Sequence, residues 1–489
     1  MTVQRLAPIV ASLAPSNHPY LNGAWTPQHE EIDADDLEVI EGAIPPDLDG
    51  VYLRNTENQV HQPLGRYHPF DGDGMIHQID FHGGRASYRN RFVRTRGFAA
   101  EQEAGGALWG GLADPVGLAK RPGFGAHGAL KDSSSTDVVV HAGLALSTFY
   151  QCGEGYRIDP LTLETLGVEA WVPIDGVSAH PKVDEATGEL MFFNYSKPAP
   201  FLHFGVVDAQ NRLVSYRPVP VLGPRLPHDM AFSEHFAILN DLPMFWDAEL
   251  LKRDIHAVRL HDGLPSRFAL VPRAGGEIRW FEAAPTYVLH WLNAYEAGDE
   301  VILDGYFQEN PMPAPRADAP AGFGPMMAYL DAHAFRPKLH RWRFNLADGS
   351  TREERLDDRV LEFGVIDPRR AGRPYRYAYS TLLQPGWFLF TGWVKHDLFT
   401  GESWTHELGP GRYASESPFA PRLGSAAEDD GYLVSFITDE NAGTSECILI
   451  DAARLQEGPV CRIALPHKLC SGAHACWAPR EQLRAPAIL

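Results

Sequence analysis

The sequence predicts an all-β protein built from many short, paired strands. Helical periodicity is scarce, while runs rich in Val, Ile, Phe, Tyr and Trp recur along the chain and are separated by Gly, Asp, Asn and Pro. Turn sequences such as Asp348-Gly349 lie between paired runs. Paired strands that recur through a long chain are typical of a β-propeller or of a sandwich array, and the residues alone leave both open.

The expected strands follow one another in pairs along the chain. The clearest pairs are residues 136–141 with 145–150, 190–195 with 202–207, 288–293 with 300–306, 387–394 with 403–408, and 432–438 with 446–451. The expected helices are few and short: residues 115–119, 248–253 and 324–333. No composition shift marks a boundary, so we expect one domain over residues 1–489.

Composition excludes several classes of protein. The formal net charge of −20 argues against a nucleic-acid or anionic-membrane partner. No run of 18 apolar residues occurs, so we expect no transmembrane helix, and the first residues do not resemble a secretory signal. Five cysteines are few and odd in number, which predicts a cytoplasmic protein without a disulfide framework.

Four histidines stand in distinctive sequence frames. They are His180 in Val-Ser-Ala-His-Pro-Lys, His228 in Leu-Pro-His-Asp-Met, His290 in Val-Leu-His-Trp-Leu-Asn-Ala-Tyr-Glu, and His474 in Ser-Gly-Ala-His-Ala-Cys. They are too far apart for a local metal finger, but a closed ring-like fold would bring them to one axis. Imidazole suits divalent iron, copper, nickel and zinc. The alternative for any single histidine is a packing or surface role.

Two further motifs accompany these frames: Tyr-His-Pro-Phe-Asp-Gly-Asp-Gly-Met-Ile-His at 67–77 and Glu-Asp-Asp-Gly-Tyr-Leu at 428–433. Together the motifs resemble the carotenoid cleavage oxygenase family, which includes the lignostilbene dioxygenases, from about Asp36 to Pro479. The resemblance implies a seven-bladed β-propeller with loops and short helices forming a dome over the active-site face. It also implies one Fe(II) per chain, held by His180, His228, His290 and His474.

The family resemblance also implies carboxylates that accept hydrogen bonds from the ligand imidazoles and so fix their orientation. Glu362 and Glu416 match two such positions, whereas the third position holds the neutral Gln151. Glu154 is the alternative third partner. Thr136 matches a family threonine near the open coordination position, and its alternative role is that of an ordinary strand residue.

Residues 91–101 resemble the lignostilbene- and isoeugenol-cleaving branch of the family. Stilbene-cleaving relatives hold the substrate phenol with a lysine, matched here by Lys131, and a tyrosine, replaced here by Phe98. The alternative for Lys131 is a solvated charge beside Asp132. Phe307, which follows the strand after His290, is expected to be an aromatic wall of the substrate site, or else ordinary core.

These expectations define a reaction and its partners. The resemblance implies Fe(II)- and O2-dependent cleavage of a conjugated C=C bond to two aldehydes, with Lys131 and Thr136 at the reacting site. The expected partners are O2 and a small hydrophobic aromatic alkene, above all a hydroxystilbene. Alternatives are a carotenoid or apocarotenoid, an isoeugenol-type phenylpropene, or a propeller that binds a ligand without catalysis. A homodimer is compatible with the sequence.

Overall fold

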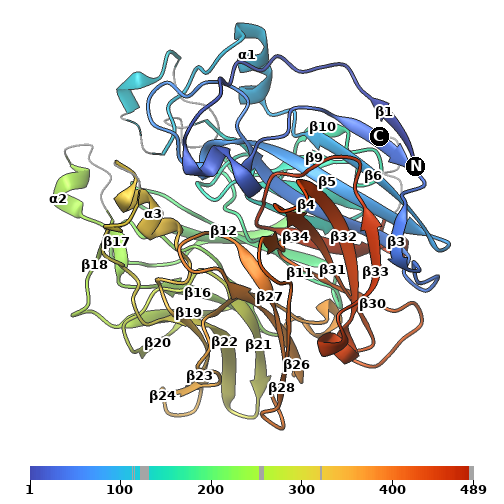
Figure 1. Ribbon diagram of the computed structural model, residues 1–489. Helices are drawn as coiled ribbons and strands as arrows, with labels where there is room; N and C mark the ends of the chain where they lie inside the picture. The colour runs from blue at the N-terminus through green and yellow to red at the C-terminus, as the bar shows by residue number, and fades with distance from the viewer. Residues whose placement is uncertain (113, 115, 122–130, 253–257, 320–321, 484–489) are drawn as a thin grey trace. The chain divides into compact units, whose positions relative to one another are not determined.

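Strands dominate the computed structural model, which describes residues 1–112, 114, 116–121, 131–252, 258–319 and 322–483 (Figure 1). The contacts within the chain divide it into two compact units. Unit 1 comprises Met1–Ala179 and Leu408–Leu489, and unit 2 comprises His180–Glu407. That the whole chain is one domain stays a prediction.

Almost all of the described strands belong to seven antiparallel sheets of at least four strands each. Three of them belong to unit 1 and four to unit 2. In most of these sheets the strands are neighbours in the order of the chain, as in the blades of a propeller. The predicted fold class, a seven-bladed β-propeller, is confirmed. The expected strand pairs are present, with ends shifted by a few residues.

Two sheets of unit 1 combine strands from the two ends of the chain. The first sheet contains, in spatial order, β1 (Thr2–Arg5), β2 (Ile32–Asp35), β6 (Arg85–Phe92), β5 (Asp73–His82), β4 (Gly50–Asn58) and β34 (Ala475–Pro479). The second contains β29 (Arg412–Tyr413), β31 (Gly431–Asp439), β32 (Thr444–Asp451), β33 (Pro459–Ala464) and β3 (Val39–Gly42), and β30 (Phe419–Pro421) pairs with β31. The pairing of β4 with β34 fixes the segment that follows His474 (Figure 1).

The third sheet of unit 1 is a simple meander of β7 (Asp137–His141), β8 (Leu144–Thr148), β9 (Tyr156–Ile158) and β10 (Thr165–Val168).

Unit 2 consists of four consecutive meanders. Their strands are β11 (Lys182–Asp184), β12 (Glu189–Tyr195), β13 (Leu202–Val207) and β14 (Leu213–Pro218); β15 (Ala231–Phe232), β16 (Phe236–Asp241), β19 (Ser266–Pro272) and β20 (Arg279–Ala283); β21 (Trp291–Ala297), β22 (Glu300–Gln308), β23 (Pro337–Asn345) and β24 (Thr351–Arg355); and β25 (Leu361–Val365), β26 (Tyr377–Leu383), β27 (Phe390–Asp397) and β28 (Ser403–Glu407). The hairpin of β17 (Met244–Trp246) and β18 (Val258–Leu260) is inserted between β16 and β19.

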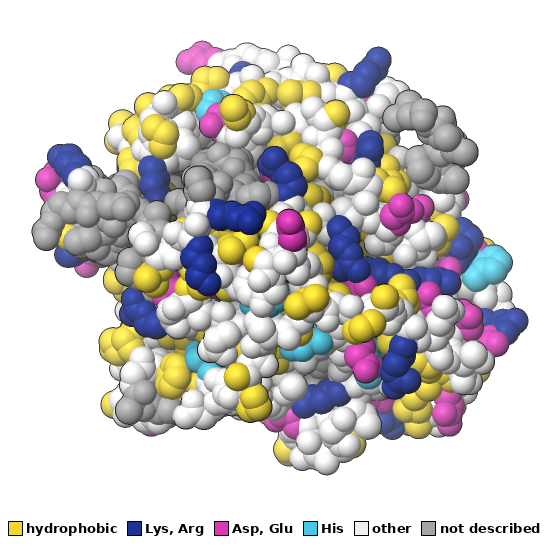
Figure 2. Space-filling model, turned by 90° about the horizontal axis from the view of Figure 1, so that it is seen from above, with side chains coloured by type: hydrophobic (Ala, Val, Ile, Leu, Met, Phe, Trp, Pro, Cys, Tyr) yellow, Lys and Arg dark blue, Asp and Glu magenta, His cyan; other side chains and the backbone are white. Residues whose placement is uncertain are grey.

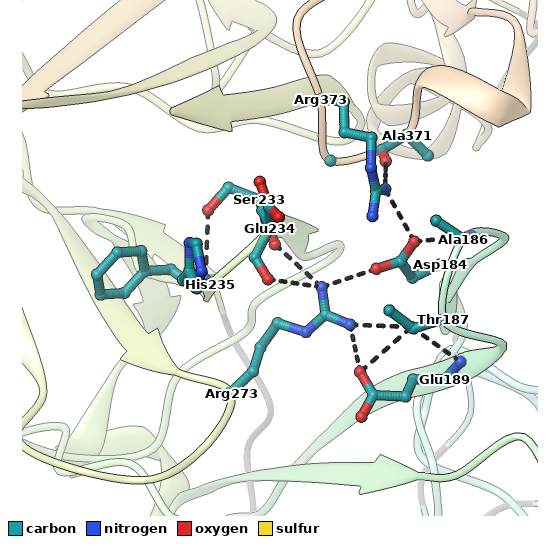
Figure 3. Close-up of polar contacts among 12 residues, drawn as sticks. Asp184, Ala186, Thr187, Glu189, Ser233, Glu234, His235, Arg273, Ala371 and Arg373 are labelled. Atoms are coloured by element: carbon teal, nitrogen blue, oxygen red, sulfur yellow. Dashed lines mark hydrogen bonds and ion pairs between the residues drawn. The ribbon is translucent and has the colours of Figure 1, made fainter. Parts of the chain in front are cut away.

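Apolar and polar contacts hold the sheets of unit 2 together. Phe268 and Trp342, on β19 and β23, are fully buried, and their rings lie 5.8 Å apart. At the end of β11, the buried Asp184 accepts hydrogen bonds from Arg273 and Arg373, each at 2.9 Å (Figure 3). Burial raises the pKa of Asp184, but the two guanidinium groups lower it by more, so its pKa is below the ordinary value. The carboxylate therefore links three sheet regions as an anion.

The described residues contain three α-helices: α1 (Arg96–Ala104), α2 (Ala248–Leu251) and α3 (Gly324–Leu330). None of the helices in this part of the chain is long and apolar enough to span a membrane. Helix α1 was not expected, although Thr95 accepts from the Phe98 N–H as an N-cap and Gly105 ends the helix at a φ of 67°.

The expected helices differ from the observed ones. Residues 116–118 form only a 3-10 turn, and position 115 lies outside the described residues. Helix α2 has its expected start, whereas position 253, its expected end, also lies outside them. Helix α3 ends at Leu330 rather than at 333, because Asp331 has a non-helical ψ of 81°. The dome of loops and helices stays a prediction.

Candidate metal centre

Each predicted histidine ligand stands just before the edge strand of a sheet. His180, His228 and His290 precede β11, β15 and β21, the first strands of three consecutive sheets in unit 2. His474 precedes β34, the edge strand of a sheet in unit 1. The four sequence frames therefore correspond to one structural position, which recurs at the start of an edge strand.

The three histidines of unit 2 converge. The ring centroids of His180 and His228 lie 5.0 Å apart, those of His180 and His290 5.1 Å apart, and those of His228 and His290 5.2 Å apart. His180 and His290 are buried, whereas His228 is half-buried. This separation places three imidazoles around one point rather than in a stack.

The chemistry of this donor set fits a divalent transition metal. Imidazole nitrogens bind such ions at about 2.0–2.1 Å. Ligand nitrogens of His180 and His290 lie within 4.8 Å of each other, close enough to bind a common ion, and the His228 ring lies beside both. Their neutral forms leave the charge of the ion uncompensated. The residues present therefore fit the iron that the family resemblance implies.

Backbone conformation at the site departs from the ordinary regions of φ and ψ. His180 has a φ of 63°, and Phe363, beside Glu362, has a φ of 49°. Residues other than glycine rarely adopt this left-handed conformation, and such residues cluster at functional sites. His180 directly precedes Pro181, whose ring fixes its own φ. The direction of the His180 imidazole therefore depends on backbone angles that are restricted at both residues.

A buried carboxylate orients His290. The Nδ1–H of His290 donates to Oε2 of Glu362 at 2.7 Å, and the Phe363 N–H donates to the same oxygen at 2.7 Å. Glu362 is fully buried on β25. Because Nδ1 is engaged, Nε2 is the nitrogen available to a metal.

His474 has a corresponding partner within unit 1. Its Nδ1 lies 3.3 Å from Oε2 of Glu416, which also accepts the Ala475 N–H at 2.7 Å. Burial lowers the pKa of His474, but Glu416, Asp137 and Glu57 raise it by more, so the pKa lies above its ordinary value. The imidazole is thus held in an anionic part of unit 1 that favours a positive charge.

Gln151 and Thr136 lie around one tyrosine of unit 1. The Thr136 hydroxyl accepts the Tyr150 N–H at 3.2 Å, and Gln151 directly follows Tyr150 in the chain. Both residues belong to unit 1, and their roles toward a metal stay predictions.

The alternative third partner, Glu154, has other contacts. Its carboxylate accepts from Arg96 Nε at 3.0 Å and from the Tyr156 hydroxyl at 2.8 Å. A carboxylate held by these two donors has less capacity left for an imidazole.

Lys131 is buried between two carboxylates. Its ammonium lies 2.7 Å from Oδ1 of Asp73 and 2.6 Å from Oε2 of Glu101, and only 12% of its side chain is exposed. Burial lowers the pKa of Lys131, but the two carboxylates raise it by more, and its pKa is above the ordinary value. Its interpretation as a solvated charge beside Asp132 is therefore wrong.

A small cavity of about 40 Å³, the volume of a few water molecules, adjoins the Lys131 ammonium. It is lined by Lys131, Glu101, Gln59, His61, Asp71 and Trp109, among others.

The two aromatic residues predicted to contact substrate lie in packed surroundings. Phe98, on α1, is 4% exposed, and its ring stacks on Phe92 at 5.2 Å. Phe307, on β22, is partly buried, with its ring 5.1 Å from that of His340. Both residues thus have the contacts of core residues, and their roles as substrate contacts stay predictions.

Sequence reasoning missed two residues at this site. The Phe363 ring lies 4.3 Å from the His290 ring and 4.7 Å from that of Phe390, so it forms an apolar wall beside the histidines. Its position directly after Glu362 was the available signal. The second is Asp229, which directly follows His228 and is 1% exposed. Its partners come from distant parts of the chain, so no local pattern indicates its role.

Apolar surface near the inserted hairpin is partly covered. Phe245 lies between the Arg225 guanidinium, 3.9 Å from the ring centroid, and the His261 ring at 4.0 Å, and Trp246 is 6% exposed. Figure 2 shows basic, acidic and apolar side chains interspersed over one face of the molecule. The segment 243–246 thus exposes little apolar surface.

Comparisons with known proteins agree with the motifs and the fold. The sequence model of the retinal pigment epithelial membrane protein (RPE65) family matches residues 25–479. Carotenoid 9,10(9',10')-cleavage dioxygenase 1 of Pisum sativum is 31% identical over 516 residues, covering 96% of this chain and 92% of that protein. Lignostilbene-α,β-dioxygenase isozyme III of Sphingomonas paucimobilis is 30% identical over 503 residues, covering 95% of this chain and 97% of that protein.

A solved structure extends the likeness to the fold. The crystal structure of the Pseudomonas brassicacearum lignostilbene dioxygenase superposes with a TM-score of 0.82 at 26% identity, covering 96% of this chain and all of that chain. The match of the family model over most of the sequence confirms the resemblance of the motifs. The chain therefore belongs to the RPE65/carotenoid cleavage oxygenase family.

Proposed function

We propose that this protein is an iron-dependent oxygenase that uses O2 to cleave a C=C bond conjugated to an aromatic ring, giving two aldehydes. The observation that carries the proposal is the convergence of His180, His228 and His290 at the starts of three neighbouring sheets. The family supports it, because its members include carotenoid and lignostilbene dioxygenases. A ligand-binding propeller without catalysis has no need of such a histidine cluster.

We assign His474 as the fourth ligand of one Fe(II) per chain. Its support is the sequence frame, its place before an edge strand, and a carboxylate partner like that of His290. When bound, the iron supplies the redox chemistry with O2. Glu362 and Glu416 hold Nδ1 of their histidines, which would leave Nε2 to bind the ion, and Gln151 would supply a neutral third acceptor.

The substrate class that we propose is a para-hydroxystilbene, with Lys131 at the phenol. The Lys131 ammonium donates to Glu101 at 2.6 Å and forms an ion pair with Asp73 at 2.7 Å. A lysine ammonium has three donors, so it can also donate to a phenol oxygen, while a carboxylate can accept a hydrogen bond from the phenol O–H. The two anions outweigh the single cation, so this group favours a neutral phenol over a phenolate.

A carotenoid or apocarotenoid is the second candidate. The family supports it, because its members include carotenoid and apocarotenoid oxygenases. Phe98, which has no hydroxyl for a phenol, instead favours an isoeugenol-type phenylpropene over a stilbene. The contacts that cover Phe245 argue against a carotenoid substrate. A carotenoid must be taken from an apolar phase, and this uptake requires an exposed apolar surface on the protein. An isoeugenol-type phenylpropene would use the same Lys131 contact as a stilbene.

O2 and a small aromatic alkene are the proposed partners. The low cysteine content supports a cytoplasmic location, and a homodimer stays a prediction.

The substrate is tested by assaying iron-loaded protein on a hydroxystilbene, isoeugenol and an apocarotenal. With a phenolic substrate, Lys131→Met should reduce turnover by roughly tenfold to a hundredfold, because a hydrogen bond to a charged group contributes about 1.5–3 kcal/mol. Phe98→Tyr should raise activity on hydroxystilbenes. Lys395→Met is the control, since Lys395 is also buried but lies over the Tyr377 ring and is not one of the predicted site residues.

A Lys131→Met protein as active as wild type on every phenolic substrate would exclude the stilbene assignment. Activity on the apocarotenal alone would establish the second candidate.

A further inference from the structure

We propose that Asp229 is a positioning residue that fixes two proposed iron ligands, His180 and His290, through their neighbours in the chain. The inference rests on the proposed function of the histidine cluster. Asp229 acts through Lys182 and Trp291.

The Asp229 carboxylate joins three chain segments that each carry a proposed ligand. Oδ1 lies 2.7 Å from the Lys182 Nζ, two residues after His180. Oδ2 accepts the Trp291 N–H at 2.9 Å, directly after His290. Asp229 itself directly follows His228. One buried side chain therefore connects the starts of β11, β15 and β21.

Backbone contacts of Asp229 strengthen this connection. Its carbonyl oxygen accepts from the Trp291 indole N–H at 3.3 Å and from the Asn240 amide at 2.7 Å. Its Oδ1 also accepts the Met230 N–H at 2.7 Å. Both the side chain and the main chain of Asp229 are thus fixed, so the carboxylate is a rigid reference point for its partners.

The short connections to the histidines make this rigidity effective. Trp291 N belongs to the peptide bond that links it to His290, so its hydrogen bond fixes that peptide plane. Only Pro181 separates Lys182 from His180, and its ring restricts φ. His180 has a φ of 63°, a conformation that persists only where its surroundings hold it. The Lys182–Asp229 ion pair is such a constraint.

A second buried aspartate provides the matched control. Asp184 lies on the same strand, β11, but at the end away from His180, and Arg273 and Arg373 bind it (Figure 3). Asp184→Asn and Asp229→Asn both remove a buried charge that is paired with cations. Both should destabilise the apoprotein, whereas only Asp229→Asn should loosen the metal site.

The experiment compares iron release to a chelator, apoprotein Tm and the visible absorption of Co(II)-substituted protein. In Asp229→Asn one carboxylate oxygen becomes an amide NH2 group, which cannot accept from either the Lys182 ammonium or the Trp291 N–H, so one arm of the network is lost whichever way the amide turns. We expect iron affinity to fall by about tenfold, near the lower end of changes beside metal ligands. The Co(II) spectrum should also change, whereas Asp184→Asn should lower the apoprotein Tm with wild-type release and spectrum.

Lys182→Met tests the Lys182–Asp229 ion pair from its other side. The risk to folding is lower, because 26% of the Lys182 side chain is exposed. This variant should also speed iron release, and adding it to Asp229→Asn should give little further loss, since the two residues act as a pair. Wild-type iron release in both single variants would overturn the inference. So would an Asp184→Asn protein that releases iron as fast as Asp229→Asn. Wild-type protein that retains no iron would instead overturn the proposed function itself.

Discussion

The His290–Glu362 pair of unit 2 and the His474–Glu416 pair of unit 1 share one arrangement but differ in length and burial. In both pairs, one carboxylate oxygen accepts from imidazole Nδ1 and from a backbone N–H. The Nδ1–Oε2 distance is 2.7 Å in unit 2 and 3.3 Å in unit 1. The Glu362 side chain is 1% exposed and that of Glu416 is 17% exposed.

This difference indicates that the two units orient their histidines with unequal strength. A short charge-assisted hydrogen bond away from water is stronger than a longer, partly hydrated one. Unit 2 thus contains three of the four proposed ligands and the stronger carboxylate contact. We infer that Glu362 orients His290 more firmly than Glu416 orients His474.

The largest expected effect is that of His290→Ala. Removing this ligand should abolish iron retention and activity, a loss beyond the 10- to 100-fold typical of residues that only support a ligand. The apoprotein Tm of His290→Ala should stay close to that of wild type and fall no further than that of the control variant His396→Ala. That control is matched because His396 is also buried and bonds a carboxylate, Asp357, at 2.9 Å. Full activity in His290→Ala would contradict the ligand assignment.

Glu362→Gln should have the next largest effect, because an amide carries no charge to stabilise the imidazole N–H. Iron affinity or turnover should fall by about 10- to 100-fold, as measured by chelator competition and steady-state rates. Glu446→Gln is the control, since Glu446 is a buried carboxylate paired with Arg462 at 2.9 Å outside the predicted site. Equal iron release in the two variants would show that Glu362 supports the fold alone.

Glu416→Gln should weaken iron retention less than Glu362→Gln, by about tenfold or less, because the bond that it alters is longer and more exposed. The same chelator assay gives the ratio of the two effects. A larger loss in Glu416→Gln than in Glu362→Gln would reverse the comparison between the units. Wild-type behaviour in both would refute the assignment of these carboxylates.

Gln151→Glu should have the smallest effect. Either side chain can accept an imidazole N–H, so the variant should fold normally and retain iron. Metal content and apoprotein Tm measure this outcome. A marked loss of iron would show that a neutral side chain is required at this position.

Local sequence patterns predicted the strands better than the helices. Residues 190–195 were expected to form a strand and lie within β12, because a short apolar and aromatic run bounded by turn residues specifies a strand, and all six of these residues are buried. Strand β21 starts only at Trp291, although Val288 is already buried, so burial and strand pairing do not coincide there. Helix α1 has a capping threonine and a terminal glycine that were available as signals, but its apolar periodicity is weak.

In the candidate site too, some residues could be predicted from the local sequence and others could not. The four histidine frames and the glutamates are local motifs, so the sequence and its family resemblance were enough to propose them. The two carboxylates around Lys131 come from β5 and α1, and their approach depends on tertiary packing. The contacts of Asp229 with Lys182 and Trp291 likewise join segments far apart in sequence. Such pairings carry no periodic signal.

The central claim is that the histidine cluster holds one iron ion. Metal analysis of purified protein, after growth with iron and zinc both supplied, tests it most directly. We expect about one iron per chain in the wild-type protein and close to none in His290→Ala at an unchanged apoprotein Tm. Stoichiometric zinc without iron, or equal iron in both proteins, would contradict the account.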